Sequence, residues 1–355
     1  MIPGGIDMSL FYIPLAVLCL WGIKYSGKAF RGDAMSVTST TAINGIFTVL
    51  VFMCYTVSWQ GYRGGTWDDR IFTDYLYPGQ LVVVPFLFFS GYGIAESLRR
   101  KPGYAKRMPR YRLGKVWLSF AAALVLYLAV NLLMGKRYTP LQIVLAFTGW
   151  GGFGNSNWFM FDILCLYALT YIAFLCARER FVIGAALTSV FSVGLIAALW
   201  YAGRDSYWWN TILFYPLGMW YSLLRPAIEK RSQRNNLVYW GLLVCAVALF
   251  AATHILYMWR HRLLLFLISG CLMMAVILLV LMKFTICNKA LLWIGKNMFW
   301  IYILQRLPML VLAKYCPQIN KFALIFSAAA CTAALTWLFS RLFDTINSIL
   351  FGKNK

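Results

Sequence analysis

Long apolar runs dominate this 355-residue chain and constrain its fold more than any other feature. A helix needs about 20 mainly apolar residues to cross about 30 Å of hydrocarbon. The composition agrees, because 61% of the residues are hydrophobic, 12% are charged and the mean hydropathy is +0.69. The sequence therefore predicts an all-α polytopic membrane protein. Eleven candidate spans lie near residues 8–23, 42–59, 79–98, 116–134, 157–176, 181–202, 208–224, 237–258, 263–282, 290–313 and 322–346.

Lysine and arginine are distributed unevenly between the two sides of the predicted membrane. Basic residues favour cytoplasmic loops, and the two sets of alternate loops carry 21 and 9 of the 33 basic residues. With eleven spans, this ratio predicts an N-terminus outside and a C-terminus in the cytoplasm. Topology then explains most of the net charge of +22. Nucleic-acid binding is not expected, because no soluble basic face remains to hold a duplex.

Asp162 is the clearest candidate for a functional residue inside a span. A charge at bilayer depth costs at least about 2.5 to 3.5 kcal/mol, so such residues tend to face the bundle interior and serve a function. On a helix Asp162 shares a face with Asn155 and Trp158, and Asn157 lies beside them. The alternative is a structural role, in which Asp162 holds two helices together with Lys296 as a possible partner.

A strongly basic loop, "RRKPGYAKRMPRYRLGK", covers residues 99–115 and carries eight basic residues and no acid. It could anchor the chain to anionic lipid, or it could cradle a phosphate-rich cytoplasmic ligand such as a coenzyme. Just before it, "SGYGIAE" places Tyr92 and Glu96 around two glycines. That break favours either close helix packing or an unwound turn that lines a cavity. The candidate phosphate-binding residues are Arg99, Arg100, Arg110, Arg112 and Lys115.

Five stretches in order resemble the acyltransferase-3 superfamily of bacterial membrane acyltransferases, which modify sugars and glycans. They are "TTAINGIFTVLVFMCY", "FFSGYGIAESLRR" with "RYRLGK", "NSNWFMFDILCLY", "FYPLGMWYSLL" and "WIGKNMFWIYILQRLPM". The family's core has ten helices with both ends in the cytoplasm, which matches the spans from 42 to 346. Residues 1–40 would then be an extra N-terminal transmembrane helix with a cytoplasmic linker, 41–350 the acyltransferase-3-like domain, and 351–355 a cytoplasmic tail.

The resemblance implies a membrane O-acyltransferase of the bacterial inner membrane. It would move an acyl group, expected to be acetyl, from cytoplasmic acyl-CoA to a hydroxyl of a sugar or envelope glycan. Acyl-CoA would be a substrate, with no bound cofactor. Membrane lipid is the other expected contact, and the sequence carries no signal for an oligomeric state. No spacing of the nine cysteines indicates a metal site, and most lie within apolar runs as small hydrophobic residues.

The chain departs from the family at its motif, a basic residue, ten residues and then a histidine. Asn44 and Tyr55 occupy these positions, and Gln305 stands where many members carry another histidine. Imidazole titrates near about pH 6.5 and suits base catalysis, whereas a phenol titrates near about pH 10. Tyr55 could orient the acceptor in a slower enzyme, Asp162 could act as the base, or the chain could bind without turnover.

These considerations define the predicted site and one competing function. The competing function is a non-catalytic pseudoenzyme, or a transporter of a glycan or lipid-linked sugar. A further possibility is that Asn44 and Tyr55 are drifted or engineered changes on an active scaffold. The predicted catalytic residues are Tyr55, Asn44 and Asp162; the predicted acceptor-binding residues are Asn155, Asn157, Trp158, Tyr92, Glu96, Gln305 and Arg306.

Overall fold

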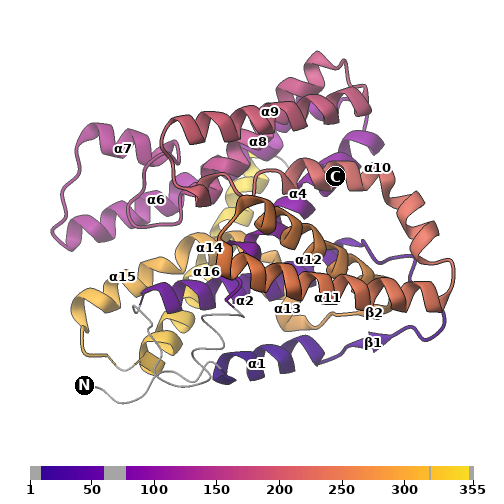
Figure 1. The fold of residues 1–355 in the computed structure, drawn as a ribbon. Helices are drawn as coiled ribbons and strands as arrows, with labels where there is room; N and C mark the ends of the chain where they lie inside the picture. The colour runs from indigo at the N-terminus through magenta and orange to yellow at the C-terminus, as the bar shows by residue number, and fades with distance from the viewer. Residues whose placement is uncertain (1–8, 60–76, 320, 352–355) are drawn as a thin grey trace. The chain divides into compact units, whose positions relative to one another are not determined.

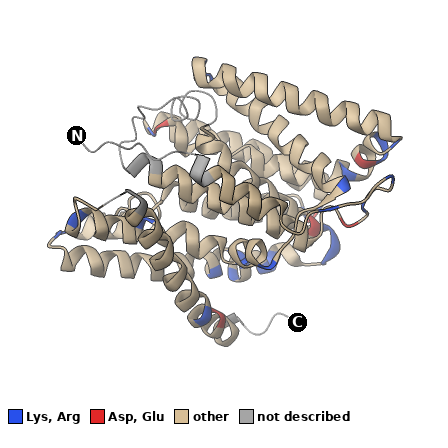
Figure 2. Cartoon of the chain, turned by 90° about the horizontal axis from the view of Figure 1, so that it is seen from below, with Lys and Arg blue, Asp and Glu red and all other residues tan. Residues whose placement is uncertain are grey.

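The fold is almost entirely helical in the computed structural model, which describes residues 9–59, 77–319 and 321–351 (Figure 1). Figure 2 shows the charged residues mainly near helix ends and connections, with long uncharged stretches between them. The α-helices are α1 (Ser9–Leu20), α2 (Val37–Trp59), α4 (Val84–Arg100), α5 (Tyr104–Met108), α6 (Lys115–Leu133), α7 (Pro140–Phe147), α8 (Trp158–Cys176), α9 (Phe181–Tyr201), α10 (Phe214–Ser232), α11 (Asn236–Arg260), α12 (Leu263–Lys283), α13 (Lys289–Lys296), α14 (Met298–Leu304), α15 (Arg306–Tyr315) and α16 (Lys321–Phe351).

Shorter elements complete the described chain. Two 3₁₀ turns, η2 (Gly79–Val83) and η4 (Ser206–Trp208), precede α4 and α10, and a π-helix, η3 (Pro109–Gly114), joins α5 to α6. Two-residue strands β1 (Lys24–Tyr25) and β2 (Phe284–Thr285) pair antiparallel, with Lys24 opposite Thr285. This sheet connects segments that are far apart in the sequence.

Eight helical segments of the described chain are long and apolar enough to cross a membrane. Each coincides with one of the apolar runs identified from the sequence. The prediction of an all-α polytopic membrane protein is therefore confirmed. The eight segments are Val37–Thr56, Gly79–Arg100, Tyr104–Leu133, Trp158–Cys176, Phe181–Tyr201, Asn236–Arg260, Leu263–Lys283 and Ala323–Leu350.

Three other predicted spans take a different form. The run at 8–23 contains α1, whose 12 residues extend only about 18 Å at 1.5 Å per residue; residue 8 lies outside the described residues. The run at 208–224 becomes η4 and the first part of α10. The run at 290–313 is divided into α13, α14 and α15, with breaks at Asn297 and Gln305. Hydropathy does not detect these breaks, because the flanking residues remain apolar.

The chain divides into two compact units. The first consists of Met1–Tyr92 and Trp220–Met298, and the second of Gly93–Met219 and Phe299–Lys355. Helices α4 and α10 each contribute residues to both units.

In the first unit, α2 and α13 pack with their backbones unusually close. A Cβ atom added to Gly295 would lie 1.9 Å from the carbonyl oxygen of Thr41, and one added to Gly45 would lie 2.4 Å from that of Leu291. Only glycine leaves room for this approach, as at other small-residue helix contacts in membrane proteins. The two glycines thus fix how α13 lies against α2.

In the second unit, α8 and α9 form a helical hairpin. A Cβ atom on Gly184 would lie 2.8 Å from the ring of Phe174, so this glycine admits the ring between the two helices. The short helix α7 precedes α8 and begins with a capping box, in which Thr139 and Gln142 each accept a hydrogen bond from the other's backbone amide. With 8 residues, α7 is too short to cross a membrane.

Candidate functional site

Asp162 is fully buried in α8, with an exposed fraction of 0%. Neither of its carboxylate oxygens accepts a hydrogen bond from any residue that the structure describes. A buried polar group without a partner costs about 1–3 kcal/mol, and more if it is charged. No hydrogen bond within the described chain ties Asp162 to another helix, and both roles considered for it, structural and functional, stay predictions.

Helix α8 contacts α14 in the same unit, where the rings of Phe159 and Tyr302 lie 5.1 Å apart. Asp162 is one turn along α8 from Phe159, and Gln305 is one turn along from Tyr302. The exposed fraction of Gln305 is also 0%. Its Nε2 donates to the carbonyl of Tyr302 at 3.1 Å, whereas its Oε1 accepts no hydrogen bond among the described residues. Helix α8 and the break after α14 therefore each carry a buried side-chain oxygen to which no described residue donates.

The loop before α8 places two asparagines next to this region. The Oδ1 of Asn155 accepts from the amide of Phe153 at 2.9 Å, while its buried Nδ2 has no partner within the described chain. A Cβ on Gly152 would lie 2.9 Å from that Oδ1, so the glycine makes room for the Asn155 amide. The Nδ2 of Asn157 donates to the carbonyl of Gly149 at 3.0 Å. The Nδ2 of Asn155 is thus not used by the described residues, whereas the Nδ2 of Asn157 stabilises the loop.

An aromatic cluster lies beside the start of α8. The ring of Trp158 packs edge-on against that of Tyr207 at 6.3 Å. The guanidinium of Arg204 lies 3.8 Å from the ring centroid of Trp150 and 4.4 Å from that of Trp208, and its Nη2 donates to the Trp150 carbonyl at 3.1 Å. Such a cation between two rings is stabilised by their quadrupoles. The sequence analysis missed Arg204, although "GRDSYWW" does place it before three aromatic residues.

Arg112 lies in the π-helix η3, which is a rare conformation found frequently at functional sites. Its Nε donates to the hydroxyl of Tyr104 at 2.8 Å, and Tyr167 and Tyr215 lie close enough for electrostatic interaction. Tyr215 in turn accepts a hydrogen bond from Thr170 at 3.1 Å. The two Nη groups of Arg112 make no hydrogen bond to the described residues, which leaves both NH2 groups to donate to an anion.

The other predicted phosphate-binding residues differ in their ion pairs, hydrogen bonds and exposure. Glu96 pairs with Arg99 at 3.5 Å and with Arg100 at 2.6 Å, one turn along the same helix. This charge neutralisation was not foreseen, and it occupies Glu96 as well. Arg110 is exposed and donates to a main-chain carbonyl of α16 at 3.0 Å. Lys115 is half-buried at the start of α6. Their predicted roles, including that of Glu96 towards the acceptor, stay predictions.

The altered family motif lies on α2 in the first unit. Asn44 and Tyr55 are eleven residues apart, which is about 16 Å along a helix axis. Both side chains are half-buried. The Oδ1 of Asn44 is itself buried and accepts no hydrogen bond from the described residues, while Tyr55 makes further contacts. Asn44 therefore has acceptor capacity to offer to a ligand.

Tyr92 belongs to a polar network that the sequence analysis did not identify. Its hydroxyl accepts a hydrogen bond from Nη1 of Arg225 at 2.9 Å, and Nε of Arg225 donates to Glu229 at 2.7 Å. The ring of Tyr92 packs 5.9 Å from that of Tyr221. The spacing of Arg225 and Glu229, four residues on a helix, is a recognisable ion-pair signal. The predicted role of Tyr92 in acceptor binding has no independent support.

The predicted site residues belong to both units, and each unit is described by itself. Arg306 is half-buried and begins α15 directly after Gln305. Within the described ranges, no group of three His, Cys, Asp or Glu residues could hold a metal ion. The first unit carries Asn44, Tyr55 and Tyr92; the second carries Asp162, Asn155, Asn157, Trp158, Glu96, Gln305, Arg306 and the basic residues from Arg99 to Lys115.

These features define a polytopic membrane protein whose helices carry buried polar groups and whose residues 99–115 are strongly basic. Comparison with protein families identifies it further: the acyltransferase domain of the acyltransferase-3 family matches residues 40–341. The chain belongs to this family and is therefore a membrane acyltransferase in general class. No curated protein and no solved structure matched the chain.

Proposed function

We propose that the protein is a membrane O-acyltransferase that transfers an acetyl group from cytoplasmic acetyl-CoA to a hydroxyl of a sugar or envelope glycan. The observation that carries this proposal is Asp162, a fully buried side chain to which no described residue donates a hydrogen bond, in a chain of the acyltransferase family. Its two oxygens and Oε1 of Gln305 are acceptors, and a sugar supplies the hydroxyl donors that they lack.

In the proposed reaction, Asp162 is the general base. The acceptor hydroxyl oxygen attacks the carbonyl carbon of the thioester and passes its proton to the Asp162 carboxylate. The carbon–sulfur bond then breaks, and the CoA thiolate leaves and takes up a proton. Gln305 and Asn155 orient the acceptor. Holding both reactants in place contributes to the rate even where a phenol has replaced the family's histidine.

Arg112 is proposed to bind a phosphate of the acyl-CoA. Support comes from its unbonded Nη groups and from its position in η3, while Arg110 and Lys115 add positive charge nearby in the sequence. Arg99 and Arg100 are partly neutralised by Glu96, so we assign them a smaller share of donor binding. We propose that the basic residues 99–115 and the C-terminus lie in the cytoplasm and the N-terminus outside, in a bacterial inner membrane.

A second function is favoured by one observation, the replacement of the motif histidine by Tyr55. A pseudoenzyme, or a transporter of a glycan or lipid-linked sugar, would keep the binding groups without needing a base at that position. Losing a general base typically costs about 10² to 10⁴ in rate. The two functions therefore differ in whether any acetyl group is transferred.

The test uses the full chain in lipid nanodiscs with labelled acetyl-CoA and isolated envelope polysaccharide. The proposal expects label on the polysaccharide, above a sample without protein. Binding of acetyl-CoA without transfer, unchanged in the double variant Asn44→Lys with Tyr55→His, would support the pseudoenzyme or transporter. A rise of orders of magnitude in the double variant would show an active scaffold whose motif has drifted.

A further inference from the structure

A segment that precedes the family domain is held onto the end of α12 by two buried cations. We name residues 24–36 the N-terminal strap. It begins with β1, which pairs with β2 directly after α12. The amides of Ser26 and Arg31 donate to the carbonyls of Lys283 and Met282 at 3.0 and 2.9 Å. The strap therefore follows the C-terminal end of α12 through main-chain bonds alone, before any side chain is considered.

Lys283 is the first of the two cations, and its exposed fraction is 0%. Its ammonium donates to the carbonyls of Gly27 and Lys28 at 2.8 and 3.2 Å and to Oδ1 of Asn236 at 2.6 Å. The ring of Phe30 lies 4.1 Å from the nitrogen. All three protons are thus used, and removing the ammonium would leave three part-buried acceptors without this donor.

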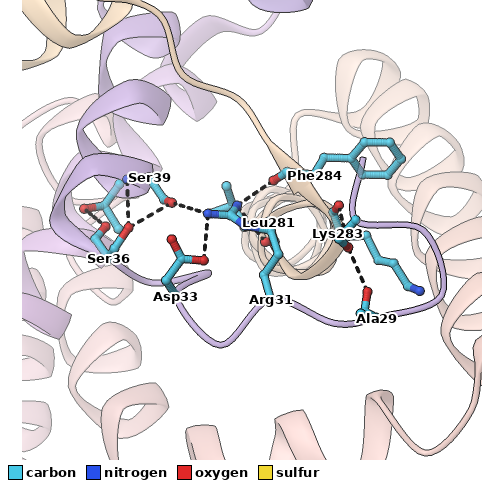
Figure 3. Close-up of polar contacts among 10 residues, drawn as sticks. Ala29, Arg31, Asp33, Ser36, Ser39, Leu281, Lys283 and Phe284 are labelled. Atoms are coloured by element: carbon cyan, nitrogen blue, oxygen red, sulfur yellow. Dashed lines mark hydrogen bonds and ion pairs between the residues drawn. The ribbon is translucent and has the colours of Figure 1, made fainter. Parts of the chain in front are cut away.

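Arg31 is the second cation, and it joins three elements (Figure 3). Its Nη1 donates to the carbonyls of Leu281 and Phe284 at 3.2 and 2.7 Å, which satisfies acceptors that a helix end leaves open. Its Nη2 donates to Oγ of Ser39 at 3.3 Å and pairs with Asp33 at 3.0 Å. Ser39 lies in the first turn of α2, so one guanidinium connects α12, the strap and α2.

Helix α1, which precedes the strap, holds the start of α13. The Oδ1 of Asn288 caps α13 by accepting from the amide of Leu291 at 2.9 Å, and its Nδ2 donates to the carbonyl of Leu18 in α1 at 2.7 Å. From there α13 runs along α2 in the close contact made by Gly45 and Gly295. Asn44 is adjacent to that contact and five residues after Ser39.

We propose that Arg31 and Lys283 are positioning residues that fix the first turns of α2, and with them Asn44, against α12 and α13. Neither residue touches a substrate in this proposal. The expected effect on acetyl transfer rests on the proposed function, whereas the expected effect on amide exchange does not. Arg31 connects the helices directly, and Lys283 holds the strap in the conformation that presents Arg31.

Hydrogen–deuterium exchange on the full chain in nanodiscs tests the link, because amides exchange through local opening. Arg31→Met should raise exchange at least tenfold in the strap and in residues 37–44, and Arg31→Lys should restore part of the protection. Ser39→Ala is the decisive variant, since it leaves Arg31 on α12 and should raise exchange in residues 37–44 only. Lys28→Met is the matched control, because this exposed side chain forms no hydrogen bond or ion pair with the described residues, and it should change nothing.

The proposal would be overturned by two results together. Arg31→Met would raise exchange in the strap alone, and residues 37–44 would exchange at the wild-type rate in both Arg31→Met and Ser39→Ala. If the wild type transfers acetyl groups, Ser39→Ala should lower kcat several-fold and leave the KM for acetyl-CoA unchanged. A wild type without transfer would refute the proposed function, while the exchange pattern would still decide the role of the strap.

Discussion

Replacing Gly295 with alanine should separate α13 from α2. The added Cβ would lie 1.9 Å from the Thr41 carbonyl oxygen, and real Cβ atoms essentially never approach other heavy atoms closer than 3.0 Å. The helices would therefore have to move apart by about 1 Å or more, and overpacking of this kind typically costs about 1–3 kcal/mol. Alanine also stabilises a helix by up to about 1 kcal/mol relative to glycine. The difference of these two effects is a loss of about 0–2 kcal/mol in the free energy of unfolding.

The assay is thermal unfolding of purified protein in one detergent, compared with Gly241→Ala in α11. A Cβ on Gly241 meets no atom within 4 Å, so this control gains helix propensity without a clash. We expect the apparent melting temperature of Gly295→Ala to fall several degrees below that of the control. Exchange in residues 41–45 should also rise in Gly295→Ala alone. Equal melting temperatures and equal exchange in the two variants would refute the close contact of α2 and α13.

Three further outcomes follow from single side chains. Arg112→Gln should raise the KM for acetyl-CoA about tenfold or more, because a charge-assisted bond to phosphate contributes about 1.5–3 kcal/mol, whereas Arg110→Gln, at an exposed position, should have a smaller effect. Thr139→Ala should destabilise α7 by about 1 kcal/mol. Amide exchange in residues 140–147 should then be faster, while the rate of acetyl transfer stays unchanged. Arg204→Gln should lower the melting temperature through loss of the cation between Trp150 and Trp208, and unchanged melting would show that this stacking contributes nothing.

Hydropathy predicted the eight long spans because it reports what a membrane requires, which is length and apolar composition. It could not detect the breaks at Asn297 and Gln305, since a helix can end inside an apolar run when other parts of the protein satisfy its backbone. Hydropathy also could not predict the close packing of α2 on α13. Gly45 and Gly295 are 250 residues apart in the sequence, and nothing local indicates that each makes room for the other helix.

The site could be predicted in part for a related reason. Asp162 was recognisable because a carboxylate in a span is rare and costly, but its lack of a partner depends on what surrounds it in three dimensions. The engagement of Arg99 and Arg100 by Glu96 follows from helical spacing and could have been predicted. The role of Arg31 could not, because its acceptors on α12 lie about 250 residues away in the sequence.

The most direct test of the account is the rate of acetyl transfer in Asp162→Asn, which keeps the size of the side chain and removes its capacity as a base. Asp344→Asn is the matched control, because Asp344 is an exposed acid on α16. We predict a fall of about 10² to 10⁴ in kcat for Asp162→Asn, with acetyl-CoA binding retained, and a wild-type rate for Asp344→Asn. Transfer by Asp162→Asn at the rate of Asp344→Asn would contradict the assignment of Asp162.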